Sequence, residues 1–199
     1  MKKWILGSVF TLIAVGLPLV SWAEGPTTTV QRLVESVRAF KPETTALSAQ
    51  ERATNTKAQK VSEETIAVPD LAKRVLGVQW SKLSTTEQKD FTQILTQLLQ
   101  KIAYPKSAEF FGELSIDYTG EKMNETGALV ETKVSHPKEG QVSIDYQLHQ
   151  VNGKWMIDDV LLDSVSLVTN VQSQIQQVIT KESYQGLLKR MREKLAESS

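Results

Sequence analysis

The residues best suited to acid–base chemistry are three aspartates, Asp158, Asp159 and Asp163, which closely follow Trp155. One interpretation is a catalytic base above an apolar pocket, as in enzymes built on curved, cone-shaped sheets. The other is structural, with acids at a strand edge that cap the following turn or pair with lysines. The segment contains no histidine, tyrosine or arginine to share the proton, so the sequence favours the structural interpretation.

Histidine and cysteine chemistry is limited in this chain. His136 precedes Pro137 in a polar turn, and His149 is expected on the solvent face of a strand. Neither has a ligand-type residue two or four positions further on, so we expect ordinary surface residues and no metal site. The chain has no cysteine, which excludes a cysteine nucleophile and disulfides. Glycine-rich phosphate-binding motifs and a G-x-S-x-G motif are also missing, so we expect a protein that is not an enzyme.

The N-terminus has the pattern of a cleavable secretion signal. Two lysines precede an apolar run over residues 4–20, and Ser21-Trp22-Ala23 supplies the small residues that signal peptidase requires. Glycine and proline interrupt the run, which falls short of the ~20 apolar residues that a spanning helix needs. We expect residues 1–23 to be removed and residues 24–199 to form one exported, soluble domain without a lipid anchor.

The charge of the mature chain argues against two classes of partner. Cleavage after Ala23 would remove two lysines from the 23 basic residues and none of the 23 acidic ones. A slightly acidic chain without a basic stripe is not typical of a nucleic-acid-binding protein. It also lacks the polybasic segment that grips anionic lipid headgroups.

Helical spacing of apolar residues is found on both sides of a central region of strands. We expect helices within about residues 27–105 and 169–197. The most apolar helix follows the capping box Ser84-Thr85-Thr86-Glu87 and is expected to end at Tyr104-Pro105. Its stripe is wider than one sheet face requires and contains Phe91, Ile94, Leu95, Leu98, Leu99 and Ile102.

Other helix ends are marked by residues with terminal preferences. Lys41-Pro42 should stop the first helix. Asp70 is expected to be the N-cap of a short helix that ends at Gly77. The closing region is predicted to form two helices, with apolar faces over residues 168–179 and 184–195.

Residues 113–168 alternate between apolar and polar side chains, as half-buried antiparallel strands do. Val151-Asn152-Gly153-Lys154 is predicted to be a tight hairpin turn. A meander of four or five strands between helices predicts an α+β fold with a curved antiparallel sheet. The concave face of such a sheet either fills with side chains or encloses an apolar cavity, and periodicity does not separate the two.

Several short motifs, taken in order, resemble those of MlaC-like proteins, the toluene-tolerance family of periplasmic phospholipid-binding proteins. The first half contains Leu76-Gly77-Val78-Gln79-Trp80, Leu83-Ser84, Phe91, Leu98-Leu99 and Tyr104, similar to the family's LG-x-x-W, F, LL and Y. The second half contains Gly153-Lys154-Trp155-Met156-Ile157-Asp158-Asp159-Val160, Asp163-Ser164-Val165-Ser166-Leu167-Val168 and Tyr184-Gln185-Gly186-Leu187-Leu188. The chain departs from the family at Ser164, usually glycine, and at Val171-Gln172, commonly tyrosine and arginine.

The resemblance implies a cone-like, NTF2-like sheet with N-terminal and C-terminal helices that enclose an apolar pocket. It implies a periplasmic carrier of glycerophospholipid, with the lipid as cargo and no cofactor. It implies a monomer that moves lipid between an inner-membrane ABC transporter with an MCE-domain component and an outer-membrane lipoprotein–porin complex. Two alternatives stay open: an isomerase- or dehydratase-type enzyme with an aspartate base, and a protein-binding adaptor with a filled core.

The expected lining of the lipid pocket combines helix and sheet residues. The alternation of the strands selects the sheet face, and the apolar stripes select the helix positions. The predicted lining is Val75, Leu76, Phe91, Leu95, Leu98, Leu99, Tyr104, Ile116, Tyr118, Val130, Ile144, Tyr146, Trp155, Ile157 and Val165.

Overall fold

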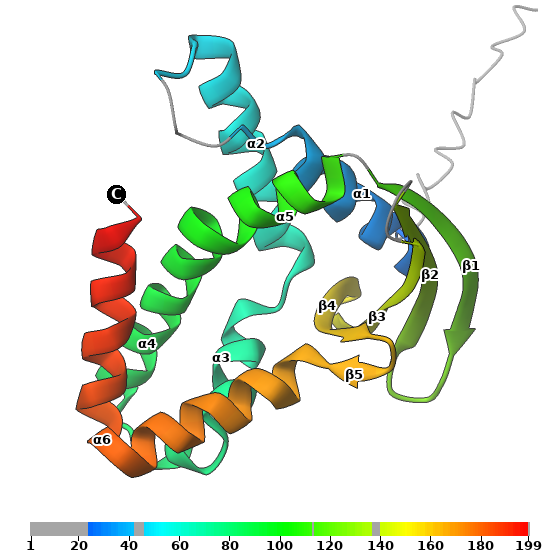
Figure 1. Cartoon of the computed structure of the whole chain (residues 1–199). Helices are drawn as coiled ribbons and strands as arrows, with labels where there is room; N and C mark the ends of the chain where they lie inside the picture. Colours follow the sequence, from blue (N-terminus) through cyan, green and yellow to red (C-terminus); the bar gives the residue numbers. More distant parts are fainter. Residues whose placement is uncertain (1–23, 42–45, 113, 137–139, 199) are drawn as a thin grey trace, which may run out of the picture.

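The computed structural model describes residues 24–41, 46–112, 114–136 and 140–198, and the expected signal peptide lies outside these ranges. The first half contains α1 (Pro26–Ala39), α2 (Ala49–Thr65), α3 (Val68–Leu76), the 3-10 helix η1 (Gly77–Lys82), α4 (Thr85–Leu98), the π-helical turn η2 (Leu99–Ala103) and α5 (Tyr104–Gly112). The second half contains β1 (Ser115–Met123), β2 (Ala128–His136), β3 (Gly140–Val151), β4 (Lys154–Leu162), β5 (Val165–Ser166) and α6 (Leu167–Glu197) (Figure 1). Within the described ranges, no helix has both the length and the apolarity needed to cross a membrane.

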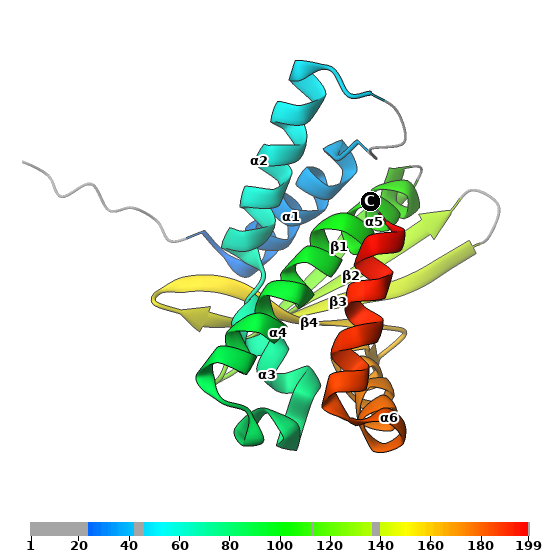
Figure 2. The same cartoon turned by 90° about the vertical axis from the view of Figure 1, so that its left-hand side faces the viewer.

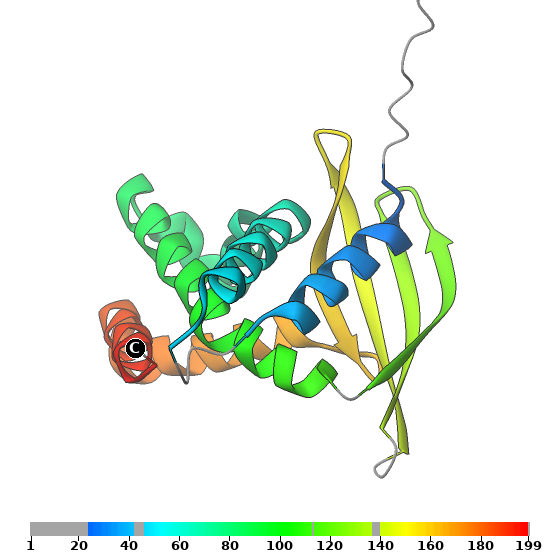
Figure 3. The same cartoon turned by 90° about the horizontal axis from the view of Figure 1, so that it is seen from above.

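The strands form a five-stranded antiparallel meander in the order β1-β2-β3-β4-β5. The predicted hairpin at Asn152-Gly153 joins β3 to β4, and both residues have positive φ, 51° and 77°. Figure 3 shows α1 lying along the concave side of the curved sheet. These features confirm the α+β class and the curved antiparallel sheet expected from the alternation of side chains.

A first hydrophobic core, here called the sheet core, lies between α1 and the inner face of the sheet. The alternation places every second residue of β2, β3 and β4 on this face, as expected from the pleat. Its most deeply buried members, each less than 10% exposed, include Val30, Val34, Val37, Val130, Val134, Ile144, Tyr146, Leu148 and Ile157.

A second, separate core, here called the helical core, lies among α3, α4 and α6. Figure 2 shows the C-terminal half of α6 running beside α4. Its buried members are Ala72, Val75, Leu76, Leu83, Phe91, Ile94, Val168, Tyr184, Leu187, Leu188 and Leu195. The buried apolar surface of the chain is therefore divided between two clusters.

The longest apolar stripe does not end at Tyr104-Pro105, as the sequence predicted. The helix passes through the π-helical turn η2, in which the Tyr104 N–H donates to the Leu99 carbonyl, and continues as α5. Proline disrupts a regular α-helix because it has no N–H and its ring crowds the preceding turn. A wider π turn just before Pro105 changes the hydrogen-bond register there, and the helix continues from the helical core to the sheet core.

Other predicted helix ends were confirmed or corrected. The capping box at Ser84 is formed, with its Oγ accepting from the Glu87 N–H. Asp70 is not an N-cap, because α3 begins two residues earlier and Pro69 occupies its first turn, a position that favours proline. α6 is interrupted at Ser183, with φ 74° and ψ 170°, so the closing region contains two helical segments as expected.

Gly77 ends α3 in a conformation that requires glycine, with φ 53° and ψ −129°. A Cβ there would lie 2.6 Å from Nε2 of Gln172. We predict that Gly77→Ala lowers the free energy of unfolding by about 2 kcal/mol, because of backbone strain; the Gln172 amide ends a flexible side chain and can move aside. The measurement is urea denaturation followed by circular dichroism.

The matched control is Gly112→Ala, where an added Cβ meets no heavy atom within 4 Å. This variant should stay within about 0.5 kcal/mol of the parent. Equal effects of the two substitutions would contradict the assignment of strain to Gly77.

Candidate functional site

The predicted lining residues do not form one continuous wall. Seven belong to the sheet core or pack against it: Ile116, Tyr118, Val130, Ile144, Tyr146, Trp155 and Ile157. Five belong to the helical core or pack against it: Val75, Leu76, Phe91, Leu95 and Leu98. Leu99 and Tyr104 lie in and directly after η2, between the two cores, and Val165 is 59% exposed.

Burial separates these residues into two kinds. Leu76, Phe91 and Val130 are fully buried, so in this conformation they pack against the protein's own side chains. By contrast, Leu95, Leu98 and Leu99 are only partly buried, although they are large and apolar. The partly exposed apolar surface therefore lies along the middle of the helix that runs from α4 through η2.

A second stretch of available apolar surface surrounds the junction between the sheet and α6. Leu162, Val165, Leu167 and Val171 are each between 38% and 59% exposed. Of these four residues, only Val165 belongs to the predicted lining. Alternation and helical spacing stop being informative at this junction, where a strand, a turn and a helix follow within a few residues.

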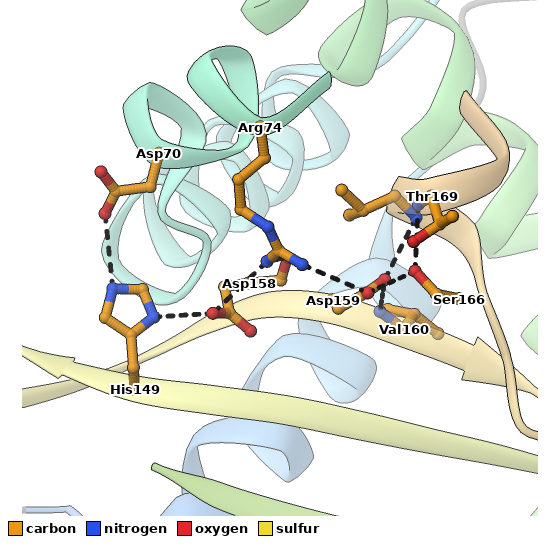
Figure 4. A network of polar contacts seen from close by, with 9 residues as sticks. Asp70, Arg74, His149, Asp158, Asp159, Val160, Ser166 and Thr169 are labelled. Carbon is orange, nitrogen blue, oxygen red and sulfur yellow. Dashed lines mark hydrogen bonds and ion pairs between the residues drawn. The ribbon is translucent and has the colours of Figure 1, made fainter. Parts of the chain in front are cut away.

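Asp159 is the centre of a polar network between α3, β4 and α6 (Figure 4). Its carboxylate accepts hydrogen bonds from Val160 N at 2.8 Å, Val168 N at 3.2 Å and Ser166 Oγ at 2.5 Å. The Arg74 guanidinium lies 3.4 Å away. Asp159 is only 5% exposed, and its oxygens are occupied by these partners. This confirms the structural interpretation of Asp159, except that its cationic partner is an arginine instead of a lysine.

His149 is not the ordinary surface residue that the sequence predicted. Its Nε2 lies 3.4 Å from an oxygen of Asp70, and its Nδ1 lies 3.1 Å from an oxygen of Asp158. It does point to the outer face of β3, but the start of α3 covers that face. The contact joins residues far apart in the sequence, so local spacing carried no signal for it.

A cleft of about 730 Å³ opens beside this network. Its lining consists of Asp70, Lys73, Arg74, Gly77, His149, Asp158, Val168, Thr169 and Gln172. Apart from Gly77 and Val168, these residues are polar or charged, and several already pair with one another. The cleft differs from the apolar pocket expected beneath a catalytic aspartate.

The third aspartate of the cluster is also engaged in structure. Asp163 Oδ1 accepts from Ser143 N at 3.0 Å, and Asp163 N donates to the Ser143 carbonyl at 2.9 Å. These bonds fix the turn that follows β4. Among the described residues, no three His, Asp or Glu side chains are grouped as metal ligands.

The chain is similar to a known protein family and to a solved structure. A family model described as "MlaC protein" matches residues 28–193 of the chain. A solved structure of a phospholipid-binding protein from Ralstonia solanacearum, in complex with a phospholipid, is similar to this fold with a TM-score of 0.66. The match covers 86% of this chain and 95% of that one at 16% identity, which establishes likeness of fold. No curated protein matches the chain.

The four tyrosines of the chain provide a test of the two cores. Burial is the main cause that raises the pKa of Tyr104, Tyr118 and Tyr146 above 10, and it raises the pKa of Tyr184 to about 12. The folded protein therefore keeps phenolic protons that the unfolded chain loses near pH 10. We predict that the contribution of these groups to stability is complete below pH 10 and is lost as the pH rises toward 12 and above.

The measurement is a titration of phenolate absorbance in the native protein and in the urea-unfolded chain. The native midpoints should all lie above the unfolded midpoint. A native tyrosine that ionises together with the unfolded chain would contradict the burial of that residue.

Proposed function

The chain belongs to the MlaC family, and from this premise we propose that it binds glycerophospholipid and carries it through the periplasm. The observation that supports this proposal most directly is the partly exposed apolar face of the α4–η2 helix. Leu95 and Leu98 pack against the edge of the helical core and Leu99 lies in η2, and all three are only partly buried. A bound acyl chain would complete their burial.

The energetics favour a carrier that holds its cargo tightly. At ~0.8 kcal/mol per buried CH₂, two acyl chains gain more than about 20 kcal/mol on leaving water. That gain exceeds the practical limit of non-covalent affinity, about 18–21 kcal/mol. Opening of the protein and ordering of the chains must offset the difference. Release into water should be slow, and delivery should require a partner that opens the binding surface.

The two cores also suggest how acyl chains are admitted. Phe91, among α3, α4 and α6, and Val130, beneath α1, are both 0% exposed, so an acyl chain reaches them only if the elements of their own core move apart. Half-buried residues such as Leu95 and Trp155 are accessible with a smaller movement. We propose that acyl chains first contact the half-buried residues and that the headgroup remains near the mouth.

The proposed partners follow from the family and from the export signal. The carrier would receive and deliver lipid at an inner-membrane ABC transporter with an MCE-domain component and at an outer-membrane lipoprotein–porin complex. It would act as a monomer with no cofactor and without catalysing a reaction. The engagement of Asp159 and Asp163 in structural bonds supports a binding role over the enzyme alternative.

We predict that the protein purified from a bacterial periplasm contains diacyl phospholipid. Native mass spectrometry followed by organic extraction should find close to one lipid per chain, with mixed headgroups because the acyl chains dominate recognition. A lipid-free protein that also takes up no lipid from vesicles would refute the carrier proposal.

The lining is tested by Leu95→Glu, which places a carboxylate on the half-buried apolar face. A charge there loses solvation when a chain covers it, so bound lipid should fall by about tenfold or more. Ile144 is less suitable for this test because it is 2% exposed within the sheet core, where a charge would unfold the protein.

The matched control is Val78→Glu, which introduces the same group at an apolar residue that is 74% exposed. Val78→Glu should retain lipid as the parent does, and circular dichroism should show that both variants are folded. Equal lipid content in the folded Leu95→Glu variant would remove Leu95 from the lining.

A further inference from the structure

The sheet core and the helical core are joined by the chain at three places in its described part. The first is the connection between α2 and α3, where Ala67 N donates to the Ile157 carbonyl at 3.2 Å. The second is η2. The third is the turn from β4 to α6, where Asp163 and Ser164 have positive φ, 45° and 70°. Figure 3 shows the two parts of the molecule side by side.

Side chains make a further connection at Asp159. Arg74, on α3 of the helical core, donates from Nη1 to the Asp158 carbonyl at 2.6 Å and lies 3.4 Å from the Asp159 carboxylate. The same carboxylate receives Ser166 Oγ and Val168 N at the start of α6. One carboxylate of β4 therefore holds both α3 and α6. We call Arg74, Asp159, Ser166 and the Val168 N–H the Asp159 junction.

The two partners of this ion pair differ in burial, so their separation costs the carboxylate more than the arginine. The Asp159 side chain is 3% exposed, while that of Arg74 is 38% exposed. If α3 moved away from β4, the arginine would regain water, but the carboxylate would lose its cation while still largely surrounded by protein. A buried charge without its partner is strongly unfavourable. The junction therefore favours the conformation in which the two cores lie together.

A second polar link between the cores is weaker. His149 of β3 lies 3.4 Å from Asp70 of α3, and the Asp70 side chain is 54% exposed. Solvent screens such a contact. The Asp159 junction is thus the better buried of the two links.

We propose that Arg74 and Asp159 are positioning residues that hold α3 and the start of α6 against the sheet and thereby set the rate at which bound lipid leaves. This inference rests on the proposed carrier function. Neither residue needs to touch the lipid. They act because the separation of the two cores uncovers the partly buried apolar residues between them, such as Leu99, and requires the ion pair between α3 and β4 to break.

The test compares the transfer of a fluorescent phospholipid from the loaded protein to vesicles of phosphatidylethanolamine and phosphatidylglycerol. Asp159→Asn keeps the side-chain shape and Arg74→Gln keeps a polar side chain, while both remove the ion pair, and each should accelerate transfer by about tenfold. Arg74→Lys retains the charge and should be closer to the parent. A lower melting temperature with an unchanged transfer rate in Arg74→Gln would show a merely structural role and overturn the inference.

The matched control is Arg192→Gln, which removes an ion pair of 2.7 Å between α6 and Asp90 of α4. That pair is exposed, joins two helices that build the helical core, and does not cross to the sheet. Transfer by this variant should stay within about twofold of the parent, as expected for an exposed ion pair. An acceleration equal to that of Arg74→Gln would overturn the specific role of the Asp159 junction.

A second measurement does not depend on lipid. The chain has no cysteine, so single cysteines introduced at Lys122 and Lys189, whose side chains are 68% and 77% exposed, can carry spin labels on the two parts. Arg74→Gln should broaden the distance distribution between the labels, and Arg192→Gln should not. If the parent protein takes up no lipid, the carrier proposal fails, yet this distribution still decides whether the junction holds the cores together. An unchanged distribution in Arg74→Gln would overturn the inference.

Discussion

The division of buried apolar surface into two cores is the constraint on which the rest of this structure depends. The chain has no cysteine, so both cores must be stabilised by apolar burial without disulfides. The sheet core is closed by α1, and the helical core is closed by the second half of α6. Each has its own closing helix, and Leu95, Leu98 and Leu99 of the helix that joins them are only partly buried.

The α4–η2–α5 helix connects the two cores. It is unusually apolar because it contributes residues to both. Its beginning contributes Phe91 and Ile94 to the helical core, and its end contributes Ala108 to the sheet core. The residues between them belong fully to neither. An apolar stripe of this kind is costly in water unless something covers it, and the acyl chains of a phospholipid have the required chemistry.

The acidic cluster shows how the same residues support different interpretations until their partners are known. Three aspartates close together resemble an acid–base site, yet Asp159 and Asp163 are occupied by backbone and side-chain donors. Their effect is to fix the turn between β4 and α6 and the position of α3. The charged groups of the cluster thus organise the boundary between the cores, and the apolar groups beside that boundary form the surface that we propose binds lipid.

The sequence by itself determined the elements and their faces, because alternation and helical spacing are local consequences of backbone geometry. It predicted the meander, the Asn152-Gly153 turn and the Ser84 cap, and it contains the family motifs. The alternation also placed most inward-facing residues correctly. Local rules failed where two of them conflicted. Pro105 was expected to end a helix, but the π turn accommodates it. Asp70 was expected to be an N-cap, but the helix begins earlier, with proline in its first turn. Only the tertiary structure decided that the predicted lining is divided between two cores, that His149 lies between two carboxylates, and that Arg74 reaches Asp159 from 85 positions away. These contacts depend on how α3 and α6 pack against β4, and no spacing within a single element encodes that arrangement.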